Sequence, residues 1–386
     1  MTTFATAAQR WAGIGPYYAM FPIPFSDAVV EAFTEPGDLV LDPFAGRASS
    51  IFSAATRART AIGVEINPVG WVYGNAKLFP ARHSNLEHRL GQLSDLANDV
   101  GSDDIGRLPP FFRCCFHPDV LKFLLAARAN LHWRSSSVDR TLMAFILVYL
   151  HGKRGQALSN QMRQSKAMSP QYSVSWWHRH RMTPLKTNPV DFLRPRIAWR
   201  YAKGLPTVSR ATLALGDSCR LLRRLTKSHR PAKLLFTSPP YLGVTNYYYD
   251  QWLRLWMLGG PERPRRTGET HKGKFESHAN YRVLLYTVFT ACAEVMDDAG
   301  YVYVRTDARP DTLALTREIL ETTFPSWAMT ATERPFARPT QTALFGDKSR
   351  KPGEIDLVLC GPKARKPDFR LPADPPERSL LRLIPF

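Results

Sequence analysis

The sequence has few cysteines, no long apolar run and a shortage of acidic residues. Its five cysteines include no Cys-x-x-Cys pair and their number is odd, so we expect neither a disulfide framework nor a metal site. The longest strongly apolar run, residues 141–150, covers about half a bilayer and predicts a buried helix. Residues 1–10 lack a charged segment followed by an apolar one. We therefore expect no secretion signal and a cytoplasmic protein.

The shortage of acids leaves a strongly basic chain. Among 386 residues, 52 Lys and Arg outnumber 33 Asp and Glu, giving a net charge of +19. Such a charge favours a polyanionic partner, either nucleic acid or an anionic membrane. Residues 1–105 carry a net charge of −4, whereas residues 151–210 carry twelve basic side chains and one acid. The basic excess is therefore concentrated in one segment. That segment has no apolar anchor beside it, which argues against a membrane.

Two parts of the chain alternate short apolar strands with helices, which is typical of an α/β fold with a parallel sheet. The first part has a strand, a loop, a helix and a strand at residues 39–41, 42–46, 49–55 and 60–65. The second part has strands at 233–237, 301–304 and 355–359, and helices at 281–296 and 313–322. Between them, residues 118–133 and 141–150 predict helices, and the chain then becomes basic.

We predict four regions from this pattern. Residues 1–82 and 207–362 form the two parts of one cofactor-binding catalytic domain, and residues 83–206 form a largely helical, basic insertion. Residues 363–386 contain several prolines and predict an irregular tail.

Polar residues follow two of the predicted strands. Asp42 and Gly46 lie in the loop after the first strand, and Glu65 ends the second. Ligands of parallel sheets bind at these strand ends, where Gly46 permits close approach and Glu65 is placed to accept hydrogen bonds from ribose hydroxyls. The loop lacks Gly-x-Gly-x-x-Gly, and Asp42 would repel a pyrophosphate. A cationic ligand with an amino group and a ribose, such as S-adenosylmethionine, fits better than a dinucleotide. The alternative is a tight turn with an incidental acid.

The segment Ser238-Pro239-Pro240-Tyr241 follows the strand at 233–237. Two prolines fix the backbone and remove two donors, so the carbonyl groups there are held rigidly. A planar base can stack on Tyr241 while Ser238 and the Pro239 carbonyl accept both N–H bonds of its exocyclic amine. Attack of such an amine on a methyl sulfonium needs positioning more than acid–base catalysis. The alternative is a structural turn.

Together, Asp42-Pro43-Phe44-Ala45-Gly46 and Ser238-Pro239-Pro240-Tyr241 resemble motifs of the S-adenosylmethionine-dependent DNA amino-methyltransferases, which methylate N4 of cytosine or N6 of adenine. Residues 17–22, 64–68 and 215–218 are similar to further cofactor motifs of that family. The resemblance covers residues 15–82 and about 210–361. It implies a Rossmann-like methyltransferase fold with a mostly parallel seven-stranded sheet.

The resemblance also implies roles for single residues. It places Asp42 near the methionine amine, Glu65 on the ribose and Asp217 on the adenine. The implied cofactor residues are Tyr18, Phe21, Asp42, Pro43, Phe44, Ala45, Gly46, Glu65, Ile66, Asn67, Asp217 and Ser218. The sequence departs from the family at two places. Ala48 replaces a frequent glycine, and the large insertion separates the cofactor motif at 64–68 from the one at 215–218. Ser238 in place of an acid favours N4 of cytosine over N6 of adenine.

The basic insertion combines cations for phosphates with amides for base edges, as DNA recognition requires. The candidate DNA contacts are Arg163, Lys166, Arg179, Arg181, Arg194, Arg196 and Arg200, and the candidate amides are Asn160, Gln161, Gln164 and Gln171. The alternative is a solvated charged surface. Trp176-Trp177 can stack on a base or pack in the core, and the aromatic run 246–252 can line the base pocket or pack in the core. Double-stranded DNA is the expected partner, with base flipping into the Tyr241 pocket.

These features predict a site-specific DNA methyltransferase with S-adenosylmethionine as cofactor. N4 of cytosine is the favoured target. The alternatives are an N6-adenine DNA methyltransferase, an RNA amino-methyltransferase and an inactive DNA-binding protein. C5-cytosine methylation, which needs a cysteine nucleophile from a Pro-Cys pair, is excluded because the chain has no such pair. A cognate restriction endonuclease is a candidate second partner, and the nucleoid is the expected location.

Overall fold

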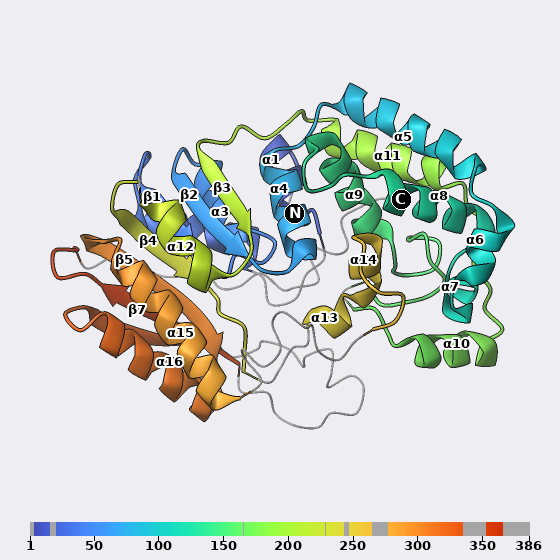
Figure 1. The fold of residues 1–386 in the computed structure, drawn as a ribbon. Helices are drawn as coiled ribbons and strands as arrows, with labels where there is room; N and C mark the ends of the chain where they lie inside the picture. Colours follow the sequence, from blue (N-terminus) through green and yellow to red (C-terminus); the bar gives the residue numbers. More distant parts are fainter. Residues whose placement is uncertain are drawn as a thin grey trace.

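The computed structural model describes residues 4–15, 21–164, 166–227, 229–242, 247–264, 277–334 and 353–365. Within these residues the strands form one seven-stranded sheet of order β3-β2-β1-β4-β5-β7-β6 (Figure 1). The strands are β1 (Leu39–Asp42), β2 (Thr60–Glu65), β3 (Ala211–Leu215), β4 (Ala232–Thr237), β5 (Met296–Asp307), β6 (Ala328–Arg334) and β7 (Glu354–Cys360). Strand β7 runs antiparallel to both neighbours, and the other pairs are parallel. The predicted α/β fold with a mostly parallel sheet is confirmed.

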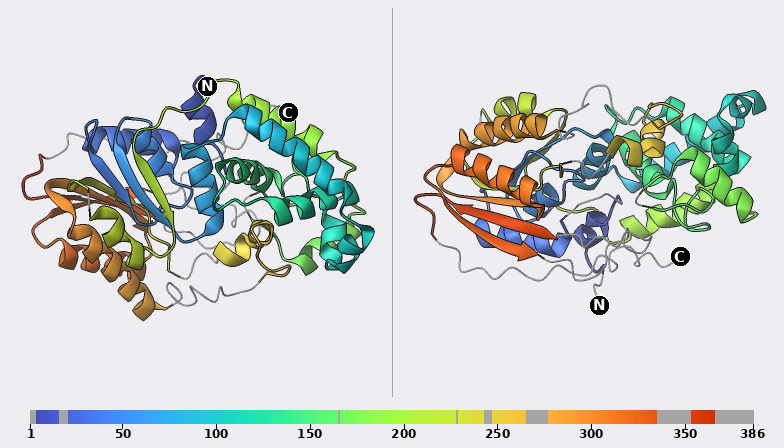
Figure 2. Two further views of the ribbon diagram at one scale, coloured as in Figure 1. Left: turned by 45° about the horizontal axis from the view of Figure 1, so that its top comes forward. Right: turned by 90° about the horizontal axis from the view of Figure 1, so that it is seen from below.

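Helices cover both faces of this sheet (Figure 2). Side chains alternate between the faces along β1, so that Val40 joins one apolar core while Leu39 and Leu41 join the other. The first core is closed by α2 (Ile23–Phe33), α3 (Ser49–Ala55) and α4 (Pro68–Leu78), and the second by α12 (Ser218–Thr226), α15 (His278–Ala293) and α16 (Pro310–Thr323). The loops at the strand ends therefore stand on a rigid three-layer support.

A separate helical part lies beside the sheet (Figure 1). Prolines at the first turn, where a missing N–H is harmless, begin several of its helices, among them Pro118, Pro170 and Pro189. It contains α5 (His83–Asn98), α6 (Ser102–Arg107), α7 (Pro110–Cys115), α8 (Pro118–Asn130), α9 (Ser137–Tyr149), α10 (Pro170–Arg179) and α11 (Pro189–Tyr201). The short N-terminal helix α1 (Ala7–Ala12) packs on α11. None of the described helices has the length and apolar character needed to cross a bilayer.

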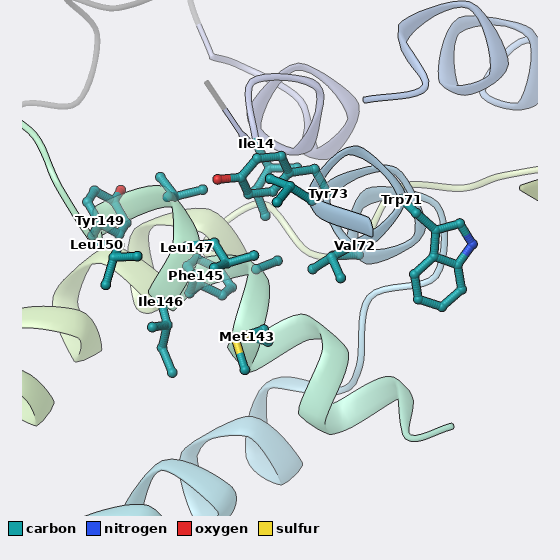
Figure 3. Packing of buried hydrophobic residues seen from close by; sticks show 14 of the residues in the cluster. Ile14, Trp71, Val72, Tyr73, Met143, Phe145, Ile146, Leu147, Tyr149 and Leu150 are labelled. Carbon is teal, nitrogen blue, oxygen red and sulfur yellow. The ribbon is translucent and has the colours of Figure 1, made fainter. Parts of the chain in front are cut away.

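The helical part is joined to the sheet through α4 and α9. Val72 and Tyr73 of α4 pack among buried residues that include Phe145 and Leu147 of α9 (Figure 3). Helix α4 begins three residues after Glu65, so it links the predicted ribose-binding residue to the insertion. A cofactor-bearing strand end and the insertion therefore share one apolar core.

The helical part also includes chain from beyond the predicted insertion. Helices α13 (Tyr247–Asp250) and α14 (Trp252–Met257) follow the Ser-Pro-Pro-Tyr segment yet pack in the helical part. Arg254 is fully buried and donates hydrogen bonds to the carbonyl oxygens of Leu147 (2.9 Å) and Gln164 (2.5 Å). Trp252 packs on Phe111, with ring centroids 5.0 Å apart. Residues 247–257 thus lie with the insertion, although the sequence pattern groups them with the α/β domain.

Lys77 of α4 is a buried lysine whose Nζ atom has no hydrogen-bond partner among the described residues. Burial lowers its pKa well below the usual range, and the neighbouring positive charges of Arg47 and Arg200 lower it further. A buried polar group without a partner lowers the stability of the folded state.

We therefore expect Lys77→Met to raise the free energy of unfolding at pH 7 by about 1–3 kcal/mol, measured by chemical denaturation. The gain should shrink toward pH ~10, because the lysine of the unfolded wild-type chain then also loses its proton and wild-type stability rises. Lys227→Met, which replaces an exposed lysine, is the matched control and should give no such gain. A loss of stability in Lys77→Met would contradict the interpretation.

Candidate active site

The residues predicted to bind cofactor and substrate follow four adjacent strands. Asp42 ends β1, Glu65 ends β2 and Asp217 caps α12 directly after β3. The Ser-Pro-Pro-Tyr segment follows β4. Because β3, β2, β1 and β4 are neighbours and parallel, these ends meet at one edge of the sheet. The structure therefore brings the two motifs of the sequence together.

Asp42 connects the cofactor loop to the catalytic strand. One carboxylate oxygen accepts hydrogen bonds from the Thr237 hydroxyl at the end of β4 (2.7 Å) and from the Phe44 amide (3.0 Å). The other oxygen accepts from the Ser50 hydroxyl on α3. Burial raises the pKa of Asp42 to about 6, although these hydrogen bonds oppose the increase. The buried carboxyl group thus fixes the loop, the helix and β4 relative to one another.

Glu65 is a second buried carboxylate at the same edge. It accepts a hydrogen bond from the Asn67 amide (2.7 Å) and further hydrogen bonds from the backbone of Gly46 and Ile66. Burial raises its pKa to about 8, and the nearby charge of Asp42 adds to the increase. Burial raises the pKa of Tyr248 on α13, and the charge of Glu65 adds to the increase.

The aromatic run 246–252 left two interpretations open, and Trp252 packs in the core. For Tyr248, whose pKa is raised further by the charge of Glu65, a place in the base pocket stays a prediction.

The site has the chemistry of a receptor for a cationic ligand with hydroxyl groups. In the described part of the chain, neither Asp42 nor Glu65 forms an ion pair with a basic side chain, although both are buried. The Nδ2 group of Asn67 and the hydroxyl of Ser49 are buried, and neither has a hydrogen-bond partner in the part of the chain that the structure describes. S-adenosylmethionine carries a sulfonium, an amine and ribose hydroxyls, which match these groups. No cluster of three or more His, Cys, Asp or Glu suited to a metal ion occurs among the described residues.

The cofactor loop explains the departure at Ala48. Both Gly46 (φ 54°) and Ala48 (φ 59°) have left-handed backbones, a conformation that favours glycine. A Cβ atom at Gly74 of α4 would lie 2.9 Å from the Cβ of Ala48, too close for two side chains. The glycine at position 74 therefore makes room for the methyl group of Ala48 at the junction of α3 and α4.

Other predicted cofactor residues have diverse positions. The Ser218 hydroxyl donates a hydrogen bond to the Pro43 carbonyl, which joins the motif at 215–218 to the loop at 42–46. Phe21 is buried against Phe236, with ring centroids 4.4 Å apart. Tyr18 lies outside the described residues. Contact of these residues with the cofactor stays a prediction.

The catalytic segment is held at its tyrosine. Pro239 is buried, whereas Ser238, Pro240 and Tyr241 are partly exposed. The Tyr241 hydroxyl donates a hydrogen bond of 2.7 Å to Glu354 at the start of β7. Burial, followed by the Glu354 charge, raises the pKa of Tyr241 well above the usual range, and the adjacent Ser238 hydroxyl opposes the increase.

The candidate DNA contacts differ in exposure. Arg179 and Arg181 are exposed at and just beyond the end of α10. Arg194 is half exposed and forms an ion pair with Glu87 at 3.0 Å. Lys166, which is partly buried, is 2.5 Å from Asp250 of α13, and Arg163 is also partly buried.

Arg196 and Arg200 do not belong with this exposed set. Both are buried in the helical part. The Arg196 guanidinium lies over the Phe192 ring at 3.6 Å and donates to the Phe192 carbonyl at 2.6 Å. Arg200 donates to the Arg10 carbonyl of α1. Because these two guanidinium groups stabilise the interior, the structure corrects their assignment as DNA contacts.

Two of the candidate base-reading groups are also structural. Asn160 is fully buried and donates to the carbonyl oxygens of Cys114 (3.2 Å) and Met182 (3.1 Å). Trp177 is buried, and its indole donates to the Gln161 carbonyl at 2.7 Å. Trp176 stacks on the His180 ring, with centroids 4.1 Å apart. This region holds the segment before α10 in place.

Residues 5–69 match the family model described as DNA methylase. No curated protein matches the chain. Among solved structures, TrmN from Thermus thermophilus is similar with a TM-score of 0.34 and 11% identity, over 92% of this chain and 52% of TrmN. This chain thus corresponds to about half the length of TrmN.

Two further solved structures are similar. A TehB-like SAM-dependent methyltransferase from Corynebacterium glutamicum has a TM-score of 0.31 and 7% identity, over 87% of each chain. The rRNA methyltransferase aviRa from Streptomyces viridochromogenes has a TM-score of 0.32 and 10% identity, over 93% of this chain and 94% of aviRa. These similarities are low, and the strand order of the sheet itself carries the fold assignment.

The strand order of the sheet is that of a Rossmann-like fold, and the family match supports S-adenosylmethionine as the cofactor of the site at its edge. The match over residues 5–69 also confirms the resemblance to the DNA amino-methyltransferases, which methylate N4 of cytosine or N6 of adenine.

The raised pKa of Glu65 predicts proton release on cofactor binding. With a pKa of about 8, Glu65 is mostly protonated at pH 7 in the free protein, whereas a carboxylate is the better acceptor for ribose hydroxyls. We therefore expect binding of S-adenosylmethionine near pH 7 to release up to about one proton, and affinity to rise with pH up to about 8. Calorimetry in buffers of different ionisation enthalpy measures this release.

Glu65→Gln should bind more weakly and lose most of the proton release. Glu318→Gln, which removes an exposed carboxylate on α16, should leave both unchanged. Equal proton release by Glu65→Gln and the wild type would place the titrating group elsewhere.

Proposed function

We propose that this protein is a DNA methyltransferase that methylates the exocyclic amine of a flipped base, with N4 of cytosine as the favoured target. The observation that carries the proposal is the hydrogen bond between Thr237 and Asp42, which joins the Ser-Pro-Pro-Tyr strand to the cofactor loop. This contact supports the proposal, because it brings the Ser-Pro-Pro-Tyr segment beside the loop that carries Asp42.

The protein's own groups bind and orient the base. Ser238 and the Pro239 carbonyl are placed to accept the two N–H bonds of an exocyclic amine, and the Tyr241 ring offers a stacking surface. These acceptors reduce the conjugation of the amine with the ring and direct its lone pair. When bound, S-adenosylmethionine supplies an electrophilic methyl group on its sulfonium. The protein contributes chiefly through positioning, and the amine releases a proton as it gains the methyl group.

The exposed cations of the helical part support DNA as the substrate. A base in a duplex does not present its amine to a pocket at the sheet edge, so we infer that the target is rotated out of the helix. Arg179 and Arg181 are exposed and are placed to bind phosphates, which position the duplex. The resembling family also uses acids at the position of Ser238. The serine found there supports cytosine as the target base.

Single-base sequencing of modified DNA tests the target. Cells expressing the wild-type gene should carry N4-methylcytosine within one defined sequence, and cells expressing Ser238→Ala should lack it. Purified Ser238→Ala should bind S-adenosylmethionine as the wild type does, because Ser238 makes no hydrogen bond to Asp42 or Glu65. Tyr241→Ala should give the same result as Ser238→Ala.

The other outcomes overturn the assignment in distinct ways. A new N6-methyladenine mark would replace cytosine by adenine. Methyl marks on RNA without a DNA mark would make RNA the substrate, and no mark on either would leave a DNA-binding protein. Full activity of both variants would exclude the Ser-Pro-Pro-Tyr segment as the active site.

Removal of charge at the end of α10 tests the DNA-binding surface. Arg179→Gln with Arg181→Gln should weaken DNA binding and reduce the slope of log affinity against log salt by about 0.9 for each lost phosphate contact. Binding titrations at several salt concentrations measure this slope. The control Arg224→Gln with Lys227→Gln removes two exposed charges from the α12 region and should change the slope less. An unchanged slope in the α10 variant would place DNA elsewhere.

A further inference from the structure

The hydroxyl of Tyr241 has a defined partner on another part of the sheet. It donates a hydrogen bond of 2.7 Å to Glu354, which lies 113 residues further along the chain. Glu354 is the first residue of β7 and pairs in register with Asp307, the last residue of β5. Because β7 is antiparallel, its beginning lies at the edge where β4 and β5 end (Figure 1).

Glu354 is itself held by a buried arginine. Arg305 of β5 lies 3.6 Å from one Glu354 oxygen. The same guanidinium makes two hydrogen bonds to Asp356 of β7, at 2.6 and 2.9 Å, and lies over the Phe25 ring at 4.2 Å. Two parallel hydrogen bonds fix a guanidinium in one plane. Arg305 therefore has one position, and it orients the Glu354 carboxylate toward the tyrosine.

A second contact holds the residue after the tyrosine. Arg309, in the connection after β5, donates to the Leu242 carbonyl at 2.5 Å. Asp307 binds the Arg309 guanidinium through hydrogen bonds of 3.0 and 2.9 Å. The side chain of residue 241 and the backbone of residue 242 are thus both held by charged groups at the β5–β7 edge.

We propose that Glu354 is a positioning residue that fixes the ring of Tyr241 for stacking on the target base. This inference rests on the proposed function, and it assigns a role to a residue outside both sequence motifs. A hydrogen bond at the phenol oxygen fixes the far end of the ring and, because a phenolic O–H prefers the plane of its ring, also favours one ring plane. A phenylalanine ring at the same position has neither restraint. Pre-set orientation of a substrate-contacting group is a recognised source of rate enhancement, and small misplacements lower rates by as much as ~10²-fold.

The charges around Tyr241 keep its hydroxyl a donor. Burial and then Glu354 raise the pKa of Tyr241, while Ser238 and Arg305 act in the opposite direction. The phenol therefore stays protonated near neutral pH, as a donor to Glu354 must be.

Three single variants, the double variant Glu354→Ala with Tyr241→Phe and one control test the inference. Glu354→Ala removes the acceptor, Glu354→Gln keeps an oxygen but loses the charge, and Tyr241→Phe removes the donor. Glu318→Gln is the control, because it removes a glutamate from an exposed ion pair with Arg282. Each is assayed for transfer of labelled methyl groups to amplified, unmethylated double-stranded DNA, and for S-adenosylmethionine affinity by calorimetry.

Glu354→Ala and Tyr241→Phe should each lower kcat/KM about tenfold or more, and the double variant should lose no more than either single change. Glu354→Gln should recover part of the loss, while the control and all cofactor affinities stay unchanged. Additive losses in the double variant, or equal activity of Glu354→Ala and the wild type, would overturn the inference.

A spectroscopic readout separates this inference from the proposed function. Tyrosine labelled with ¹³C at Cζ reports ionisation by NMR, and Tyr241→Phe identifies the Tyr241 signal. In Glu354→Gln that signal should titrate at lower pH than in the wild type, since a negative neighbour is lost. An unchanged titration would overturn the contact. If the wild type transfers no methyl group to DNA while this shift is observed, the proposed function fails and the contact stands.

Discussion

Asp42 accepts hydrogen bonds from three elements at once, and the arrangement of the site depends on them. Thr237 reaches it from β4, Ser50 from α3 and Phe44 from the loop between. A buried carboxyl group needs such partners, because an unpaired one would lower the stability of the fold. The requirement that stabilises Asp42 therefore also sets the distance between the cofactor loop and the catalytic segment. One polar contact thus joins the loop proposed to bind the methyl donor to the segment proposed to hold the amine.

The same edge is linked to the helical part from two sides. On one side, helix α4 begins three residues after Glu65 and packs on α9. On the other side, the chain that follows the Ser-Pro-Pro-Tyr segment continues through Tyr248 into α14, where Arg254 binds carbonyl groups of the insertion. Both connections consist of buried contacts, which resist displacement. A duplex bound to the helical part would therefore be held at a set position relative to Tyr241. The position of the insertion between cofactor motifs, unusual for the resembling family, gives the region proposed to bind DNA a common core with α4.

Local patterns predicted much of the fold and of the site. The strands 39–41, 60–65 and 233–237 were visible as apolar runs ending in turn signals, and the polar residues after them lie at one edge, as expected of parallel strands. The strand β6 was not predicted, because Ala328–Arg334 alternates weakly and its pairing with β7 is a long-range contact. Glu354 was also missed: its role comes from the antiparallel direction of β7, which no local pattern reveals. The burial of Arg196 was not predicted either. Arg196 lies in a segment of high charge, which predicted exposure, yet its guanidinium contacts Phe192 in the interior, and that contact depends on the tertiary fold.

Several arginines are buried, so the net charge overstates the positive charge on the surface. Arg200, Arg254 and Arg305 are all buried, and each binds carbonyl or carboxylate groups of the fold. Guanidinium suits this task because its five donors can satisfy several separate carbonyl groups where loops meet without regular pairing. The irregular chain around residues 150–169 has many such carbonyl groups. Part of the basic excess is thus required to build the fold, and the charge available to a polyanionic partner is smaller than +19 implies. The exposed cations near the end of α10 therefore matter more for the proposed contact with DNA. They are accessible, whereas other arginines of the helical part are buried in its interior.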